Sequence, residues 1–243
     1  MCYNHNTSPM SKSVLILLPA VILISGCSYT TLQKGNGFVP KTGDLLFQDL
    51  DCGSICDAIE SVTTGFAGAD FSHVGIVARD SSNRVIVIEA MSGGVQAGPL
   101  NDFLDRSFDA DGRPKVAAGR LKKPFRNLIP LALEKARQLE GKPYDKLFVI
   151  GNDAYYCSEL VYEIFLGANN NEPVFTLHPM TFKDPETGII LPAWQQYFAE
   201  LGTAVPEGQL GINPGGISRS PFLTIVHLYG IPDGWQKTAK TAK

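Results

Sequence analysis

Two neighbouring apolar runs constrain the fold of this chain more than any other feature. Residues 71–78 and 84–90 are rich in β-branched side chains, and the turn formers Asp80-Ser81-Ser82-Asn83 separate them. This pattern predicts two antiparallel strands joined by a tight turn. We therefore expect a sheet in which successive residues of this hairpin alternate between two faces.

The remaining periodic segments predict further strands and several separate helices. Strands are expected at residues 43–48, 116–120 and 222–229, and helices at residues 52–62, 128–140, 155–166 and 192–201. The helical segments do not alternate regularly with the strands, so βαβ units are not indicated. The sequence predicts an α+β protein in which an antiparallel sheet packs against a few helices.

The first 26 residues have the features of a bacterial lipoprotein signal peptide. Lys12 is their only Lys, Arg, Asp or Glu, and the apolar run at residues 14–24 is shorter than the ~20 residues that span a bilayer. The sequence Leu23-Ile24-Ser25-Gly26-Cys27 resembles a lipobox, which implies cleavage before Cys27 and lipidation of its thiol. An uncleaved anchor, an ordinary signal peptide and a start at Met10 remain open as alternatives.

These features give an expected organisation of the whole chain. Residues 1–26 are expected to be the signal peptide, 27–39 a lipidated tether, 40–235 one globular domain and 236–243 a flexible tail. Because Ser28 is not the aspartate associated with inner-membrane retention, we expect an outer-membrane anchor with the domain facing the periplasm. The formal charge of −3 offers no basic surplus for nucleic acid, so no such partner is expected.

The cysteines of the mature chain admit different interpretations. Cys52 and Cys56 either form a disulfide or are buried as separate thiols. We expect them to be unbridged, because a spacing of four on one helical turn strains a disulfide. Cys157 is then left unpaired, so it is either buried and inert or kept for its reactivity.

Cys157 is the candidate nucleophile because it begins a predicted helix. A thiol attacks a carbonyl as the thiolate, and the positive end of a helix favours that charged form. A nearby imidazole would take the proton and deliver it to the leaving group. His73, in a buried strand, is the best candidate, whereas His178 is expected at the surface and His227 in a structural role.

Glu89 is the candidate partner of His73 in the predicted hairpin. If the turn is centred on Ser81, His73 lies directly opposite Glu89, with Cβ atoms about 4.5–5.5 Å apart on one face. A carboxylate beside the imidazole orients the ring and stabilises its charged form. We further expect the start of the Cys157 helix to pack across this same face. A glutamate exposed to water at the strand end is the alternative.

Six fragments together resemble a known enzyme family. They are GDLLFQ at 43–48, FSHVGIV at 71–77, VIVIEA at 85–90, GKPYD at 141–145, YYCSELVY at 155–162 and NPGGISRSP at 213–221. They resemble the circularly permuted branch of the NlpC-type papain-like cysteine peptidases, the YaeF/YiiX-like group in particular. The permutation agrees with the order of the motifs, in which His73 precedes Cys157.

The resemblance implies a role for each candidate residue. Cys157 would be the nucleophile, His73 the general base and Glu89 the residue that orients it, with no cofactor or metal. Tyr156 would line the site and help to hold the oxyanion, and packing under the helix start is its alternative role. Gln48 is a weaker candidate for the same site.

Several functions remain open from the sequence. The leading hypothesis is a thiol hydrolase that cleaves a peptide, amide or acyl substrate of the cell envelope. The expected location suggests peptidoglycan stem peptides as the substrate. A thiol acyltransferase acting on lipid or amine substrates is an alternative, and a non-catalytic binding lipoprotein is another. A zinc site built from Cys157, His73 and Glu89, joined by Cys52 or Cys56, is a further reading that we do not favour.

The proposed anchor makes a direct prediction. Replacing Cys27 by Ser should release soluble protein or leave unprocessed precursor, because stable anchoring needs more than one acyl chain and this residue would carry them. Membrane fractionation with a radiolabelled fatty acid measures both outcomes. Unchanged membrane association without label at Cys27 would contradict the expectation.

Overall fold

The computed structural model describes residues 37–236 of the chain. The predicted signal peptide, Cys27, the tether up to residue 36 and the tail from residue 237 lie outside the described residues. Within the described part, no helix is both long and apolar enough to cross a bilayer.

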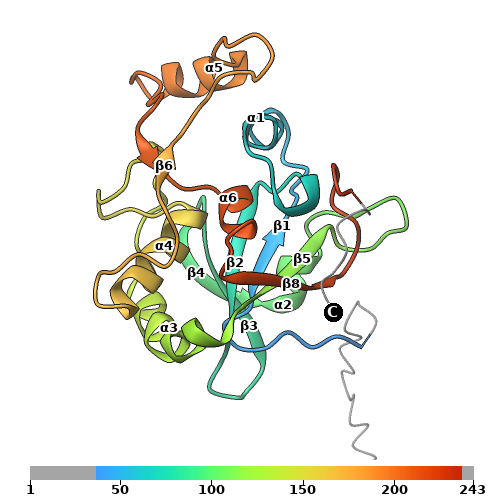
Figure 1. The fold of residues 1–243 in the computed structure, drawn as a ribbon. Helices are drawn as coiled ribbons and strands as arrows, with labels where there is room; N and C mark the ends of the chain where they lie inside the picture. Colours follow the sequence, from blue (N-terminus) through green and yellow to red (C-terminus); the bar gives the residue numbers. More distant parts are fainter. Residues whose placement is uncertain (1–36, 237–243) are drawn as a thin grey trace, which may run out of the picture. The chain divides into compact units, whose positions relative to one another are not determined.

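A six-stranded antiparallel sheet forms the centre of the described residues (Figure 1). Its spatial order is β4-β3-β2-β1-β5-β8. The bounds are β1 Leu45–Gln48, β2 His73–Arg79, β3 Val85–Met91, β4 Gly94–Pro99, β5 Val116–Leu121 and β8 Leu223–Leu228. A separate two-stranded ribbon pairs β6, His178–Pro179, with β7, Leu210–Gly211. The predicted α+β class is confirmed.

Six α-helices and two 3₁₀ turns connect the described strands. The α-helices are α1 Ser54–Val62, α2 Leu100–Leu104, α3 Ile129–Gln138, α4 Cys157–Ala168, α5 Pro192–Glu200 and α6 Pro214–Ser218. The 3₁₀ turns are η1 Phe66–Gly68 and η2 Lys123–Leu128. The turn η2 runs directly into α3, which begins at Ile129.

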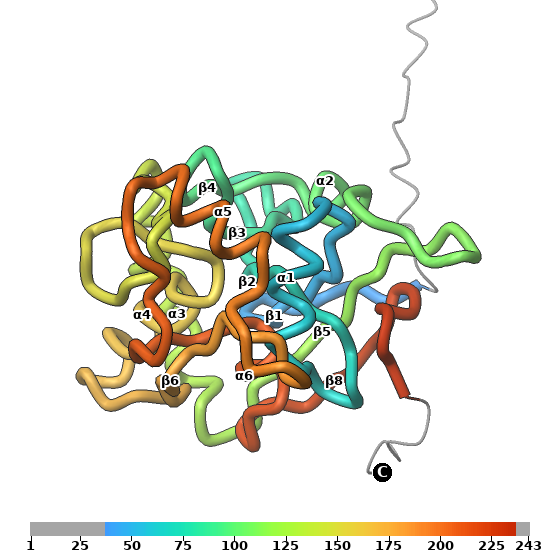
Figure 2. Tube along the Cα trace, turned by 90° about the horizontal axis from the view of Figure 1, so that it is seen from above, coloured from blue at the N-terminus to red at the C-terminus, as the bar shows by residue number. Residues whose placement is uncertain are grey.

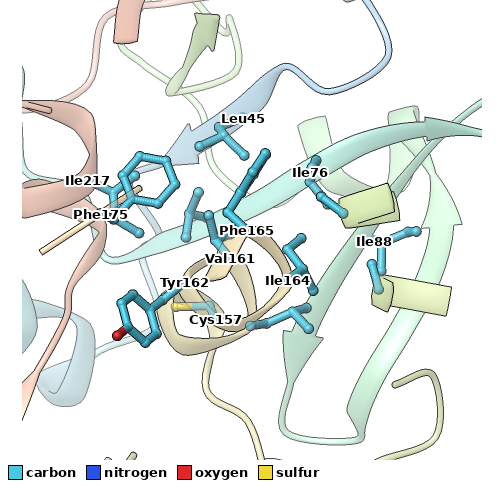
Figure 3. Close-up of a cluster of buried hydrophobic side chains, with 14 of the residues drawn as sticks. Leu45, Ile76, Ile88, Cys157, Val161, Tyr162, Ile164, Phe165, Phe175 and Ile217 are labelled. Carbon is cyan, nitrogen blue, oxygen red and sulfur yellow. The ribbon is translucent and has the colours of Figure 1, made fainter. Parts of the chain in front are cut away.

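The two faces of the sheet bury different sets of side chains. One face packs against α3 and α4, where Ile76 and Ile88 meet Val161, Ile164 and Phe165 (Figure 3). The opposite face packs against α2 through a second cluster, Leu46, Val77, Val87, Leu100, Phe103, Leu104, Val116, Ala118 and Tyr229. Both faces of the central strands are therefore buried, which explains why the sequences of these strands are apolar at successive positions.

A third, smaller cluster lies where α5 packs near α1 (Figure 2). Its buried members are Ala58 of α1 and Phe182, Trp194 and Phe198. The indole N–H of Trp194 donates to the carbonyl of Ala58 at 3.3 Å, which joins the two helices. This cluster thus joins the segment between β6 and β7 to α1.

The hairpin register differs from the expected one by two residues. Val77 pairs with Val87 and not with Val85, because the turn is centred on Ser82. The Asp80 N–H donates to the Arg84 carbonyl at 3.0 Å, and the Asp80 carboxylate accepts from the N–H groups of Ser82 and Arg84. A two-residue shift keeps every side chain on its predicted face, so His73 and Glu89 become diagonal neighbours.

The expectation for Cys52 and Cys56 was wrong, because the two cysteines form a disulfide. Helix α1 begins only at Ser54, and Gly53 before it has a left-handed φ of 81°. Cys52 therefore lies outside the helix, and its Cα lies 5.4 Å from that of Cys56. That separation falls within the range that a disulfide bridges.

Candidate active site

A buried hydrogen bond joins His73 and Glu89 at one end of the sheet. The Nε2 atom of His73 lies 2.7 Å from the Glu89 carboxylate, and both residues are at most 3% exposed. His73 is the first residue of β2, and Glu89 belongs to the neighbouring β3. The two side chains share a face even in the shifted register, as alternation along the strands requires.

Arg106 is a site residue that the sequence did not reveal. Its guanidinium forms a bidentate pair with Glu89, donating to one carboxylate oxygen at 2.7 Å and to the other as well. The same guanidinium lies 5.1 Å from the ring centroid of Phe103. Arg106 follows the short helix α2 without any motif that could have marked it. It neutralises Glu89 and fixes both carboxylate oxygens.

Cys157 is the first residue of α4, as predicted, and it is buried. The expectation that α4 packs on the face carrying His73 and Glu89 was wrong. Val161 and Phe165 of α4 pack with Ile76, whose side chain points to the other face of β2 (Figure 3). The thiol and the imidazole instead meet at the end of the strand, where His73 begins β2.

The pKa of His73 is influenced by both Cys157 and Glu89. Burial alone lowers the pKa of the imidazole, but hydrogen bonds with Cys157 and Glu89 and the charges of both raise it to about 9. Since Nε2 is committed to Glu89, Nδ1 is the nitrogen available to the thiol. The structure thus brings His73 into interaction with both Cys157 and Glu89.

The pKa of Glu89 moves in the opposite direction. Desolvation raises it, but hydrogen bonds from Arg106 and His73 outweigh the desolvation and lower the pKa to about 2. Glu89 is therefore ionised at every physiological pH. A permanent carboxylate favours the charged imidazolium and fixes the orientation of the ring.

Tyr156 caps α4 directly before Cys157. Its N–H donates to the Glu159 carboxylate at 3.3 Å, and its hydroxyl accepts from the Ile212 N–H at 3.1 Å. Glu159 also accepts from the N–H of Gly151, so it satisfies backbone donors at the helix start and in the loop before it. These bonds fix the position of the Cys157 backbone, and the Tyr156 side chain lines the groove beside the thiol.

Gln48 lies beside His73 and not in the wall of the groove. The two residues are paired in the β1–β2 register, and Gln48 is fully buried. Its amide nitrogen donates to the Phe103 carbonyl at 2.8 Å, while its Oε1 has no hydrogen-bond partner. In this geometry Gln48 supports the His73 face of the sheet.

Among the described residues, the other two histidines are His178 and His227. His178 is exposed in β6. His227 lies on β8, at the far edge of the sheet order, and stacks on Phe38 with ring centroids 4.1 Å apart. Both placements agree with the surface and structural roles expected from the sequence.

A groove opens over the start of α4. It holds about 680 Å³ between its walls, including the solvent space at its mouth. Cys157 lies in its lining, together with side chains from α1, from the loop at residues 144–148, from the segment at residues 179–182, from α5 and from residues 212–214. Tyr144, another residue of this lining, was not predicted as a site residue from the sequence. Burial raises the pKa of Tyr144, as does the charge of Cys157, which places its phenol near the thiol.

The described residues contain one acidic group that is compact enough for a metal ion. Asp49, Asp51 and Asp233 each offer an oxygen, and these atoms lie within 4.8 Å of one another. The ammonium of Lys115 already lies among them, 2.6–3.0 Å from each carboxylate. This arrangement does not fit a cation site, and Cys52 and Cys56 have no thiol to offer because they are bonded to each other.

The His73–Glu89 pair predicts a specific pH dependence. His73 contributes stability that is complete below its unfolded pKa near 6.5 and is lost as the pH rises through about 9. Glu89 contributes stability that is present above pH 4.5 and is lost as the pH falls through about 2. The difference in unfolding free energy between the native chain and Glu89→Gln should therefore be largest between about pH 4.5 and 6.5 and shrink above pH 9.

Histidine NMR and denaturant titrations measure this effect. The His73 resonance should titrate near pH 9 in the native chain and at lower pH in Glu89→Gln, which loses the carboxylate charge. An imidazole that titrates at the same pH in both proteins would contradict the assigned coupling.

Comparisons with known proteins identify the family to which this chain belongs. The family model described as "Permuted papain-like amidase enzyme, YaeF/YiiX, C92 family" matches residues 39–227. The uncharacterized protein YiiX of Escherichia coli (strain K12) is 29% identical over 191 residues, covering 77% of this chain and 86% of that protein. A crystal structure described as metalloprotein yiiX from Escherichia coli O157:H7 is similar with a TM-score of 0.64 and 25% identity, covering 79% of this chain and 99% of that one. The resemblance seen in the motifs is confirmed, and the chain belongs to the permuted papain-like amidase family of the YaeF/YiiX type.

Proposed function

We propose that this protein is a cysteine hydrolase of amide bonds in which Cys157, His73 and Glu89 form the catalytic group. The observation that carries the proposal is the position of His73. It lies 2.7 Å from Glu89 through Nε2 and also interacts with the Cys157 thiol at the start of α4. The description of the family as an amidase supports the reaction class.

The first half of the reaction acylates Cys157. The thiolate sulfur attacks the amide carbonyl carbon, and a C–S bond forms as the carbonyl electrons move to oxygen. Backbone N–H groups at the start of α4 are the available donors for that oxyanion. The His73 imidazolium then gives its proton to the amide nitrogen, the C–N bond breaks, and the amine leaves.

The second half returns the enzyme to its starting state. His73 accepts a proton from water, the resulting hydroxide attacks the thioester carbonyl, and the C–S bond breaks to release the acid and the thiolate. Glu89 stabilises the imidazolium in both halves, and Arg106 keeps Glu89 ionised and in place. Arg106 acts through Glu89 and is therefore a positioning residue.

We place this activity in the cell envelope, with the domain anchored through Cys27. The Cys52–Cys56 disulfide supports an oxidising compartment, because such bonds seldom persist in a reducing cytosol. Amide substrates of the envelope, including acylated and peptide amides, are therefore the class within which the substrate is sought.

Substitution kinetics test the assignment of roles. Cys157→Ala should abolish turnover of an N-acyl p-nitroanilide, and His73→Ala should lower kcat/KM by roughly 10²- to 10⁴-fold because the proton carrier is lost. Glu89→Gln should cost less, since an orienting group contributes less than the proton carrier. His178→Ala, which changes an exposed histidine, is the matched control and should retain full activity.

Circular dichroism verifies that each variant is folded. A folded Cys157→Ala that retains activity would remove the nucleophile assignment. Equal losses in Glu89→Gln and His73→Ala would show that Glu89 has a larger part in the chemistry.

A further inference from the structure

A basic and aromatic surface lies at the end of the sheet opposite His73. Strand β5 starts beside Gln48, which pairs with His73, and ends at Leu121, which pairs with Leu223 at the start of β8 (Figure 1). The segment that follows β5 and the segment that precedes β8 therefore meet at this far end. The residues that form the surface, which we call the distal face, are Lys122, Lys123, Phe125, Arg126, Arg219 and Phe222.

Contacts between these two segments make the distal face continuous. The Lys122 N–H donates to the Phe222 carbonyl at 2.8 Å, and the rings of Phe125 and Phe222 lie with their centroids 4.6 Å apart. The Nε atom of Arg126 donates to the Leu121 carbonyl at 2.7 Å, which holds this side chain against the end of β5. The two segments, which are distant in the sequence, therefore form one surface.

The positive charge of the distal face is not neutralised by the protein. All four of its cationic residues are exposed, and none of them forms an ion pair with another described residue. No Asp or Glu occurs in residues 112–133 or 208–232, although the whole chain has a formal charge of −3. Cations gathered in this way on an acidic protein favour an anionic partner surface.

Aromatic side chains give the distal face an apolar component as well. Phe222 is 37% exposed although it is a large apolar residue, and Phe125 packs against it. Exposed apolar side chains flanked by Lys and Arg are typical of protein surfaces that lie at a membrane interface. There the cations meet lipid phosphates, and the aromatic rings enter the headgroup region. The combination of charge and aromatic surface therefore fits an anionic lipid bilayer.

The N-terminal part of the described chain enters the domain at the same end of the sheet. Gly43 lies against Ile129, since a Cβ added to this glycine would be only 2.5 Å from the Ile129 side chain. Ile129 is the first residue of α3, and it directly follows the η2 turn that contains Lys123 and Arg126. A chain anchored through Cys27 would therefore be joined to the domain at the end that carries the distal face.

We propose that the distal face docks the domain onto an anionic lipid surface, with its cations at the lipid phosphates and Phe222 among the headgroups. Strand β5 rises roughly 17 Å from Val116, in the row of His73, to Leu121 at about 3.4 Å per residue. Docking thus holds the catalytic end of the sheet away from the bilayer. The proposal is independent of the proposed function, because none of the six residues of the distal face lines the groove beside Cys157.

A tryptophan placed in the distal face reports docking directly. The full chain carrying Phe222→Trp is reconstituted in vesicles of brominated phosphatidylcholine, with or without phosphatidylglycerol. Its emission should be quenched only where phosphatidylglycerol is present. Raising the salt concentration from about 0.05 M to about 0.5 M should relieve the quenching, because screening weakens the attraction. If circular dichroism shows that Phe222→Trp is unfolded, Phe125→Trp makes the same measurement.

The native chain is the control for this measurement. Its two tryptophans, Trp194 and Trp235, lie outside the distal face and give the background quenching. Quenching of the native chain as strong as that of Phe222→Trp would show that a different surface meets the lipid. That result, equal quenching with and without phosphatidylglycerol, or no quenching in either vesicle would each overturn the proposal.

Neutral substitutions test the contribution of each segment. Lys123→Gln and Arg219→Gln, made in the Phe222→Trp chain, should each lower the ratio of docked to undocked protein about fivefold, because each removes one charge from the lipid surface. The double variant should lower it roughly 25-fold, since the two residues lie on separate segments. Lys146→Gln, at an exposed lysine outside the distal face, is the matched control and should leave the ratio unchanged. Unchanged docking in a folded double variant would contradict the proposal.

Two other occupants of the distal face would give different results. A dimer of the native chain in detergent, measured by sedimentation and lost in Phe222→Asp, would assign the face to a second copy. A blue shift of the Phe222→Trp emission on adding heparin, without quenching in either vesicle, would assign it to a soluble polyanion. Either result overturns the proposal. Docking by a chain that hydrolyses no amide would support the proposal and contradict only the proposed function.

Discussion

The buried carboxylate of Glu89 is the constraint around which the candidate active site is organised. Glu89 is 2% exposed in a sheet whose two faces are both covered, so its negative charge needs partners inside the protein. Arg106 supplies a bidentate pair and His73 supplies an N–H donor at 2.7 Å. The burial of this charge therefore determines the position of the Arg106 guanidinium and the orientation of the His73 imidazole. Because the imidazole interacts with Cys157, Glu89 also influences the thiol at the start of α4.

Three parts of the fold supply different functions to this site. The sheet holds His73 and Glu89 on neighbouring strands, where backbone hydrogen bonds fix their separation. Helix α4 brings Cys157 from the other side of the sheet, held by the apolar contacts of Val161 and Phe165. The small core around Trp194 and the loop at Phe148, whose φ of 56° is left-handed, form the walls of the groove. The chemistry and the substrate contacts thus depend on different packing interactions, and substitutions can separate them.

The sequence predicted the residues of the site better than their arrangement. His73, Glu89 and Cys157 were found because polar side chains in apolar strands and a cysteine at a helix start are conspicuous. The register was wrong by two, since turn residues alone did not show that Asp80 closes the turn on Arg84. The disulfide was missed because the start of α1 was placed before Gly53. Arg106 and Phe148 carried no local signal, because their roles depend on contacts with residues distant in the sequence or on an unusual backbone angle.

The central claim is that Glu89 acts on Cys157 through His73, and a double-mutant cycle measures this directly. The rate of Cys157 alkylation by iodoacetamide at pH 6.5 would be compared in the native chain, Glu89→Gln, His73→Ala and the double variant. The account predicts that Glu89→Gln slows alkylation when His73 is present and adds no further loss when His73 is absent. The same fractional loss in both backgrounds would show that Glu89 influences the thiol independently of the imidazole, and it would contradict the account.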